Sequence, residues 1–173
     1  MTDGVSNWNN KIFFPTDRYT LHCVEEKFAP SNKGNPMITR EFEIVSPAEI
    51  QIGDRKYNIA GLKIVQYRTV KVKDENGDWD TVKSDKSWGN FRDELLAIGF
   101  DPEAEVDDEN PPLEFKGKNI DAILYAREDV ARKSVTPEQA AKGIRQGDPI
   151  TDSNDNEIKT YQIQLQSIQG LAS

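Results

Sequence analysis

The stretch RYTLHCVEEKFAPSNKGNPMITREFEIV, from Arg18 to Val45, determines the expected fold. It contains two segments in which apolar residues recur at every second position, separated by the polar tract Ala29–Asn35. Alternation with a period of two is typical of β-strands that bury one face. The tract predicts a connection between two strands, with Gly34 or Asn35 at a positive-φ turn position. The predicted buried residues are Tyr19, Leu21 and Cys23 in the first strand and Ile38, Phe42 and Ile44 in the second.

Further strands follow from the same alternation. A short hairpin is predicted around Gly53-Asp54, and Asn76-Gly77 lies between alternating segments, which favours a second hairpin. The remaining strand segments are a run from Lys63 to Lys73, GKNIDAILYARED (117–129) and KTYQIQLQSI (159–168).

One helix is predicted over KSWGNFRDELLAIGF (86–100). Ser87 is its expected N-cap, and Gly99 is placed to end it. The acidic, proline-containing residues 101–114 predict a loop, and residues 128–157 predict a long polar connection with a helical turn at Pro137–Lys142.

The order of these elements predicts a mainly β fold. Three strand regions, one helix and two further strands match a five-stranded OB-fold-like barrel, with one helix between its third and fourth strands and an additional hairpin. A β-sandwich with one helix is the alternative. We expect one domain over residues 18–173, preceded by a flexible N-terminus at residues 1–17.

Composition and motif spacing exclude several classes of protein. The chain has 173 residues, 36% of them hydrophobic, enough for one domain with a core. No apolar run reaches membrane-spanning length, and no secretory signal opens the chain, so we expect a cytoplasmic protein. Cys23 is the one cysteine and His22 the one histidine of the chain, which disfavours a Cys/His metal site. Neighbouring residues of a strand point to opposite faces, so these two side chains do not form a catalytic pair. The acidic loops lack EF-hand spacing. We therefore expect no enzyme activity, no metal and no cofactor.

Charge is unevenly distributed along the chain. The net charge is -8, yet residues 11–73 contain 11 Lys and Arg against 7 Asp and Glu. Residues 74–114 contain 3 against 14. A mildly basic strand region therefore precedes a very acidic middle, and the net charge alone does not exclude a nucleic-acid partner.

The run from Lys63 to Lys73 carries the candidate binding residues. Alternate positions place Lys63, Tyr67, Lys71 and Lys73 on one face, which is typical of surfaces that bind single-stranded nucleic acid through cations and stacked bases. The alternative is that Tyr67 belongs to the core and the lysines only solubilise the strand. The same surface is expected to include Tyr125 and Arg127 on the fourth barrel strand and Lys33 and Arg40 at the first connection.

Several segments together resemble a family of bacteriophage early proteins related to phage single-stranded DNA-binding proteins. They are the opening stretch and WGNFRDELLAIGFDPEAEVDDENPPLEFKGKNIDAILY (88–125), so the resemblance covers most of residues 18–127. It implies an OB-fold protein that binds single-stranded DNA in phage replication or recombination, in the cytoplasm of an infected bacterium. Phage replication or recombination proteins would be its partners, and a homo-oligomer is compatible with it.

The acidic residues 103–109 suggest a regulatory role. Many single-strand binders carry an acidic C-terminal tail that competes with DNA, whereas this sequence ends SIQGLAS. We hypothesise that the internal acidic loop takes that role, the alternative being that it only keeps the protein soluble. Two rival functions stay open: a protein-interaction or virion-structural β-sandwich module, and a phosphoesterase that uses Asp107, Asp108 and Glu109.

Overall fold

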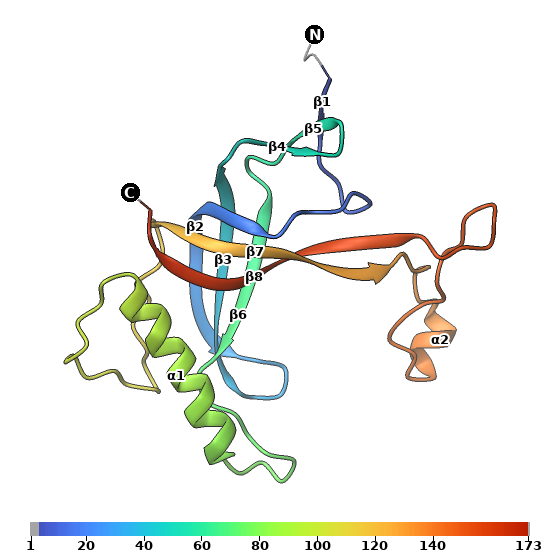
Figure 1. The fold of residues 1–173 in the computed structure, drawn as a ribbon. Helices are drawn as coiled ribbons and strands as arrows, with labels where there is room; N and C mark the ends of the chain where they lie inside the picture. Colours follow the sequence, from blue (N-terminus) through green and yellow to red (C-terminus); the bar gives the residue numbers. More distant parts are fainter. Residues whose placement is uncertain (1–3, 173) are drawn as a thin grey trace.

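The computed structural model describes residues 4–172, and over these residues the protein is mainly β, as predicted (Figure 1). The main sheet is antiparallel, with β6 (Lys63–Thr69), β3 (Pro36–Ser46), β2 (Asp17–Pro30), β7 (Asn119–Val130) and β8 (Lys159–Leu171) side by side in that order. A smaller sheet contains β1 (Val5–Asn7), β5 (Arg55–Asn58) and β4 (Glu49–Ile52). The helices are α1 (Thr81–Ala97) and α2 (Pro137–Ala141).

The main sheet is open. Its outer strands are β6 and β8, which contact one another without pairing as neighbours, so no closed barrel forms within the described residues. Helix α1 lies between the third and fourth strands of this sheet in chain order, and β4 and β5 form the additional hairpin, both as predicted. These two features of the expected architecture are confirmed.

The predicted alternation places the core correctly. Tyr19, Leu21 and Cys23 are buried, as are Ile38, Phe42 and Ile44, because successive strand residues point to opposite faces. The connection between β2 and β3 turns at Gly34, whose φ of 79° favours glycine. A register shift between Cys23 and Glu25 changes the alternation of β2, and as a result Glu26 points into the core.

Helix α1 begins earlier than predicted. Asp80, not Ser87, is its N-cap: the Asp80 side chain accepts a hydrogen bond from the Lys83 amide at 3.0 Å. The turn at Asn76-Gly77 does form, but the strand pairing after it is limited to one bridge between Lys73 and Trp79. The helix therefore replaces the second arm of the predicted hairpin. Phe91 and Leu95 on its buried face, and Ile98 at its C-cap, belong to the core.

The N-terminal segment contributes to the fold. β1 pairs in parallel with β5, and Phe14 is fully buried against Tyr19, with ring centroids 5.0 Å apart. Residues 5–14 thus differ from the flexible N-terminus that the sequence suggests. Within the polar connection 128–157, α2 forms where a helical turn is predicted, and its N-cap Thr136 makes a capping box with Gln139.

Neither helix in the described part of the chain is long and apolar enough to cross a membrane.

Candidate nucleic-acid interface

Strand β6 presents the predicted basic and aromatic residues to solvent. Lys63, Val65 and Tyr67 point outward, whereas Ile64 and Gln66 between them are buried. The side chain of Tyr67 is 64% exposed, so the alternative assignment of Tyr67 to the core is wrong. The position of an exposed tyrosine on an outer strand makes it available to a ligand.

A groove runs between β6 and β8, where the main sheet is open; we call it the edge groove. Its volume is about 740 Å³. Three of the predicted binding residues line it: Lys63 and Tyr67 from β6, and Arg127 from β7. The other side chains lining it include Trp8, Asn10, Asp129, Tyr161, Gln162 and Gln164.

The N-terminal segment supports the β8 side of the edge groove. The Tyr161 amide donates a hydrogen bond to the Asn10 carbonyl at 2.7 Å, and Phe13 packs edge-to-face on the Tyr161 ring at 5.7 Å. Trp8 is likewise held edge-to-face on the buried Phe14, with centroids 5.8 Å apart. These contacts fix two aromatic side chains of the groove that the sequence analysis did not single out.

The charges around β6 restrict where a polyanion could lie. Cross-strand register places Glu43 opposite Lys63 and Glu41 opposite Val65, with Glu25 opposite Glu41 on β2. The outer face of the sheet beside β6 therefore carries three carboxylates, of which Glu25 is paired with Lys116 at 3.3 Å. The edge groove lies on the other side of β6, where Lys63 and Arg127 outnumber the single acidic lining residue, Asp129.

A second group of predicted residues lies beyond the end of β6. The ammonium groups of Lys71 and Lys73 lie 4.3 and 5.2 Å from the ring centroid of Trp79, within the range of cation–π contacts. The backbone amide of Lys73 donates to the Asn35 side chain at 2.9 Å, which ties this segment to the β2–β3 connection. Lys33 is exposed in that same connection.

Tyr125 borders the edge groove without lining it. It is on the outward face of β7, opposite the core side as predicted, and is paired in register with Gln164. It is not among the residues that line the edge groove.

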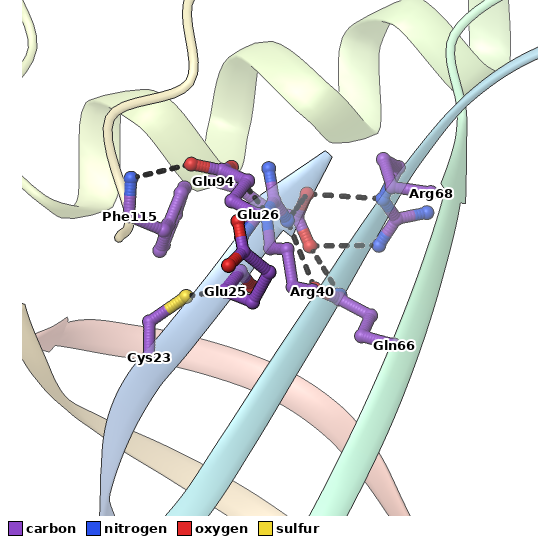
Figure 2. Close-up of polar contacts among 8 residues, drawn as sticks. All are labelled: Cys23, Glu25, Glu26, Arg40, Gln66, Arg68, Glu94 and Phe115. Atoms are coloured by element: carbon purple, nitrogen blue, oxygen red, sulfur yellow. Dashed lines mark hydrogen bonds and ion pairs between the residues drawn. The ribbon is translucent and has the colours of Figure 1, made fainter. Parts of the chain in front are cut away.

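The prediction that Arg40 contacts a ligand is wrong. Arg40 was a candidate phosphate contact, yet its side chain is 0% exposed and lies beneath α1 (Figure 2). The guanidinium donates from Nε to Glu26 and from Nη1 to Gln66 and Glu94, each at 2.9 Å. Its Cζ atom lies 4.1 Å from the Phe115 ring centroid. Arg40 thus has a structural environment and cannot reach a ligand on the surface.

Glu94 links this buried cluster to the helix. It accepts two hydrogen bonds from Arg68, at 3.0 and 2.9 Å, and one from the Gln66 amide at 2.7 Å. Burial alone raises the pKa of Glu94, but the hydrogen bonds and charges of Arg68 and Arg40 outweigh it and lower the pKa below its ordinary value. Glu94 therefore stays ionised and holds α1 on the sheet.

The sequence contained a signal for this cluster. Arg40 occupies the inward register between Ile38 and Phe42, and Glu94 lies on the helix face that carries Phe91 and Leu95. Two opposite charges at core positions predict each other as partners, because a buried charge needs compensation.

Cys23 and His22, the residues considered for a catalytic pair, lie on opposite faces of β2. Cys23 is buried, and burial, followed by the charge of Glu26, raises the pKa of its thiol to about 12. His22 points to the other face, as predicted, with Nδ1 2.7 Å from Oδ1 of Asn119. Within residues 4–172, no group of three or more His, Cys, Asp and Glu side chains comes together as a candidate metal site.

Comparison with known proteins leaves the resemblance to phage single-strand binders as a prediction. No protein-family model matches this sequence, and no curated protein is significantly similar to it.

Proposed function

We propose that the protein binds single-stranded DNA in the edge groove, without sequence preference and without enzymatic activity. The observation that carries this proposal is the combination of Trp8, Tyr67 and Tyr161 with Lys63 and Arg127 along one groove. Aromatic faces stack bases of any sequence, and cations neutralise the phosphates between them. The proposed fold is an OB-fold-like barrel left open between β6 and β8, which is the gap that the strand would occupy.

The groove suits a single strand better than a duplex. Its walls are the edges of two strands, and its aromatic residues need unpaired bases to stack on. The carboxylates of Glu25, Glu41 and Glu43 on the outer face disfavour a path across the open sheet. A role in phage replication or recombination, with replication or recombination proteins as partners, rests on the sequence resemblance.

The test is titration of a fluorescently labelled oligo-dT strand by anisotropy, at low and at moderate salt. We expect saturable binding that weakens as salt rises, because phosphate contacts release counterions. Tyr67→Ala should lower the affinity by about fivefold or more, which corresponds to one lost stacking contact of roughly 1–3 kcal/mol. The matched control is Tyr57→Ala, which removes a half-buried tyrosine of β5 in the smaller sheet that does not line the groove.

Equal losses in the two tyrosine variants would place the strand elsewhere, and absence of binding at low salt would refute the proposal. The second candidate function would then lead. Among the described residues, β6 and β8 are the outer strands of the main sheet, and the backbone of β8 hydrogen-bonds to the N-terminal segment only at Tyr161, through its amide. Such edges favour a protein-interaction or virion-structural module, because they can pair with a strand of another chain.

A further inference from the structure

A second cleft lies beyond the C-terminal end of β6, beside Lys71; we call it the Trp79 cleft. Its volume is about 350 Å³, at the small end of the range for ligand sites. It is formed by the β2–β3 connection, the segment before α1 and the acidic loop. The lining residues are Phe28, Ala29, Pro30, Pro36, Lys71, Trp79, Asp108 and Glu109.

The lining separates into an apolar and a charged part. Phe28, Pro30, Pro36 and Trp79 supply flat or ring-shaped apolar surface, and Trp79 is 43% exposed. Such a surface matches a planar group of about the size of one nucleobase. The strand ends that carry Phe28 and Pro36 belong to β2 and β3, so this wall is fixed by the main sheet.

Two cations stand beside the apolar wall. Lys71 and Lys73 both direct their ammonium groups to the indole of Trp79, which brings two positive charges to one side chain. The Lys73 ammonium group lies beside the β2–β3 connection, since a Cβ added at Gly34 would be 3.7 Å from its Nζ atom, an ordinary van der Waals contact. Both ammonium groups lie beside the same indole, and a phosphate placed there could accept a hydrogen bond from each.

We propose that the Trp79 cleft binds one nucleotide of the same DNA strand that occupies the edge groove, with its base against Phe28, Pro36 and Trp79 and its phosphate on Lys71 and Lys73. This inference rests on the proposed function. Four residues of chain separate Tyr67 from Lys71, a reach of at most about 14 Å. One strand can therefore pass from the edge groove to the cleft along β6.

Two carboxylates, Asp108 and Glu109, line the cleft beside Lys71, and Asp108 must give up its contact when the phosphate binds. Its carboxylate lies 3.6 Å from Lys71 Nζ, and both side chains are partly exposed. Ion pairs of this kind are weak, so exchange of the carboxylate for a phosphate is easy. The same lysine thus changes partner between the unbound and the bound protein.

Two oligo-dT lengths test the inference on the full chain. Strands of about 4 and about 16 nucleotides span the range of site sizes known for this kind of fold. The double variant Lys71→Gln/Lys73→Gln should bind the long strand less tightly. The slope of log affinity against log salt should become shallower by about 0.7, the value for the one phosphate that both lysines contact. The short strand is expected to bind in the edge groove, through Tyr67. In the double lysine variant its affinity should therefore change by less than about twofold.

A matched variant and a second substitution complete the design. Lys83→Gln/Lys86→Gln removes two exposed lysines from α1, which do not line the cleft, and should leave both strands unaffected. Trp79→Leu keeps an apolar wall without the aromatic face, and should weaken only the long strand, by about fivefold or more.

The outcomes separate the two proposals. Wild-type binding that depends on Tyr67 but not on Lys71, Lys73 or Trp79 overturns the cleft and leaves the edge groove standing. Equal losses in both lysine double variants also overturn it, since they indicate a general charge effect. Failure of the wild-type protein to bind either strand overturns the cleft together with the proposed function.

Discussion

Replacement of Arg40 by methionine tests the structure most directly. The arginine side chain is fully buried and is the ion-pair partner of Glu26, whose side chain is also 0% exposed. In the variant, Glu94 keeps Arg68, but Glu26 keeps only the Phe115 amide, which donates to it at 2.9 Å. An uncompensated buried carboxylate costs about 3–5 kcal/mol, a large part of the free energy of unfolding of an ordinary domain.

Urea unfolding followed by tryptophan fluorescence measures this loss. With a slope of about 2–3 kcal/mol per molar urea, the midpoint of the Arg40→Met variant should fall by roughly 1.5 M. Adding Glu26→Gln should restore much of the stability, because glutamine is neutral and can still accept from the Phe115 amide. The same pair of variants separates lost charge compensation from lost packing, which glutamine at position 26 would not repair.

Two results would contradict this reasoning. A loss below about 1 kcal/mol in Arg40→Met would mean that Glu26 is not left as a buried charge. An unchanged loss after addition of Glu26→Gln would mean that packing, not charge, sets the cost. Where the folded variant can be assayed, its affinity for oligo-dT should equal that of the wild type, because Arg40 does not reach the surface.

Three further predictions follow from the contacts described. Folding lowers the pKa of Glu94, so ionised Glu94 stabilises the protein at pH values above 4.5, its ordinary pKa, and this stabilisation is lost as the pH falls below that value. Glu94→Gln should cost about 3 kcal/mol at pH 7. In a plot of the urea midpoint against pH, the variant should show a smaller decrease at acid pH than the wild type. Cys23, with its pKa raised to about 12, should resist iodoacetamide in the folded protein and react only in urea, and rapid labelling of the native protein would contradict its burial. Deletion of residues 103–110 should raise the affinity for oligo-dT, because it frees Lys71 from Asp108. The control variant Asp152→Asn/Asp155→Asn, in the β7–β8 connection, should leave the affinity unchanged. An unchanged affinity after the deletion would contradict the hypothesis that the acidic loop competes with DNA.

The strands could be predicted because alternation depends on local sequence. The buried apolar residues of β2 and β3 repeat at the period of a pleated strand, and tertiary contacts reinforce that pattern; the exception is Glu26, which follows the register shift in β2. The start of α1 was harder to predict. Residues 81–87 have little apolar periodicity, and the helix begins there because Asp80 satisfies its first amides.

The candidate site was predictable only in part. Lys63 and Tyr67 follow from alternation along one strand, but the walls of the edge groove come from segments far apart in the chain. Trp8 lies in a segment without alternation, and Tyr161 shares the apolar face of its strand, so neither shows a binding pattern. Arg40 was misassigned because charge usually indicates a surface residue, and its two carboxylate partners are 14 and 54 residues away.

The buried cluster also has a consequence for how the chain folds. Its members come from β2, β3, β6, α1 and the segment before β7, and the Glu26–Phe115 contact spans 89 residues. Burial of only part of this cluster is unfavourable, because it leaves a desolvated charge without its partner. The charged side chains therefore become buried together. We therefore expect α1 to dock in one late, concerted step after the hairpin of β2 and β3 has formed, a step limited by long-range closure. Stopped-flow refolding should then show faster docking of α1 in Arg40→Met/Glu26→Gln than in the wild type, because that variant retains only the Glu94–Arg68 pair, in which Arg68 is partly exposed.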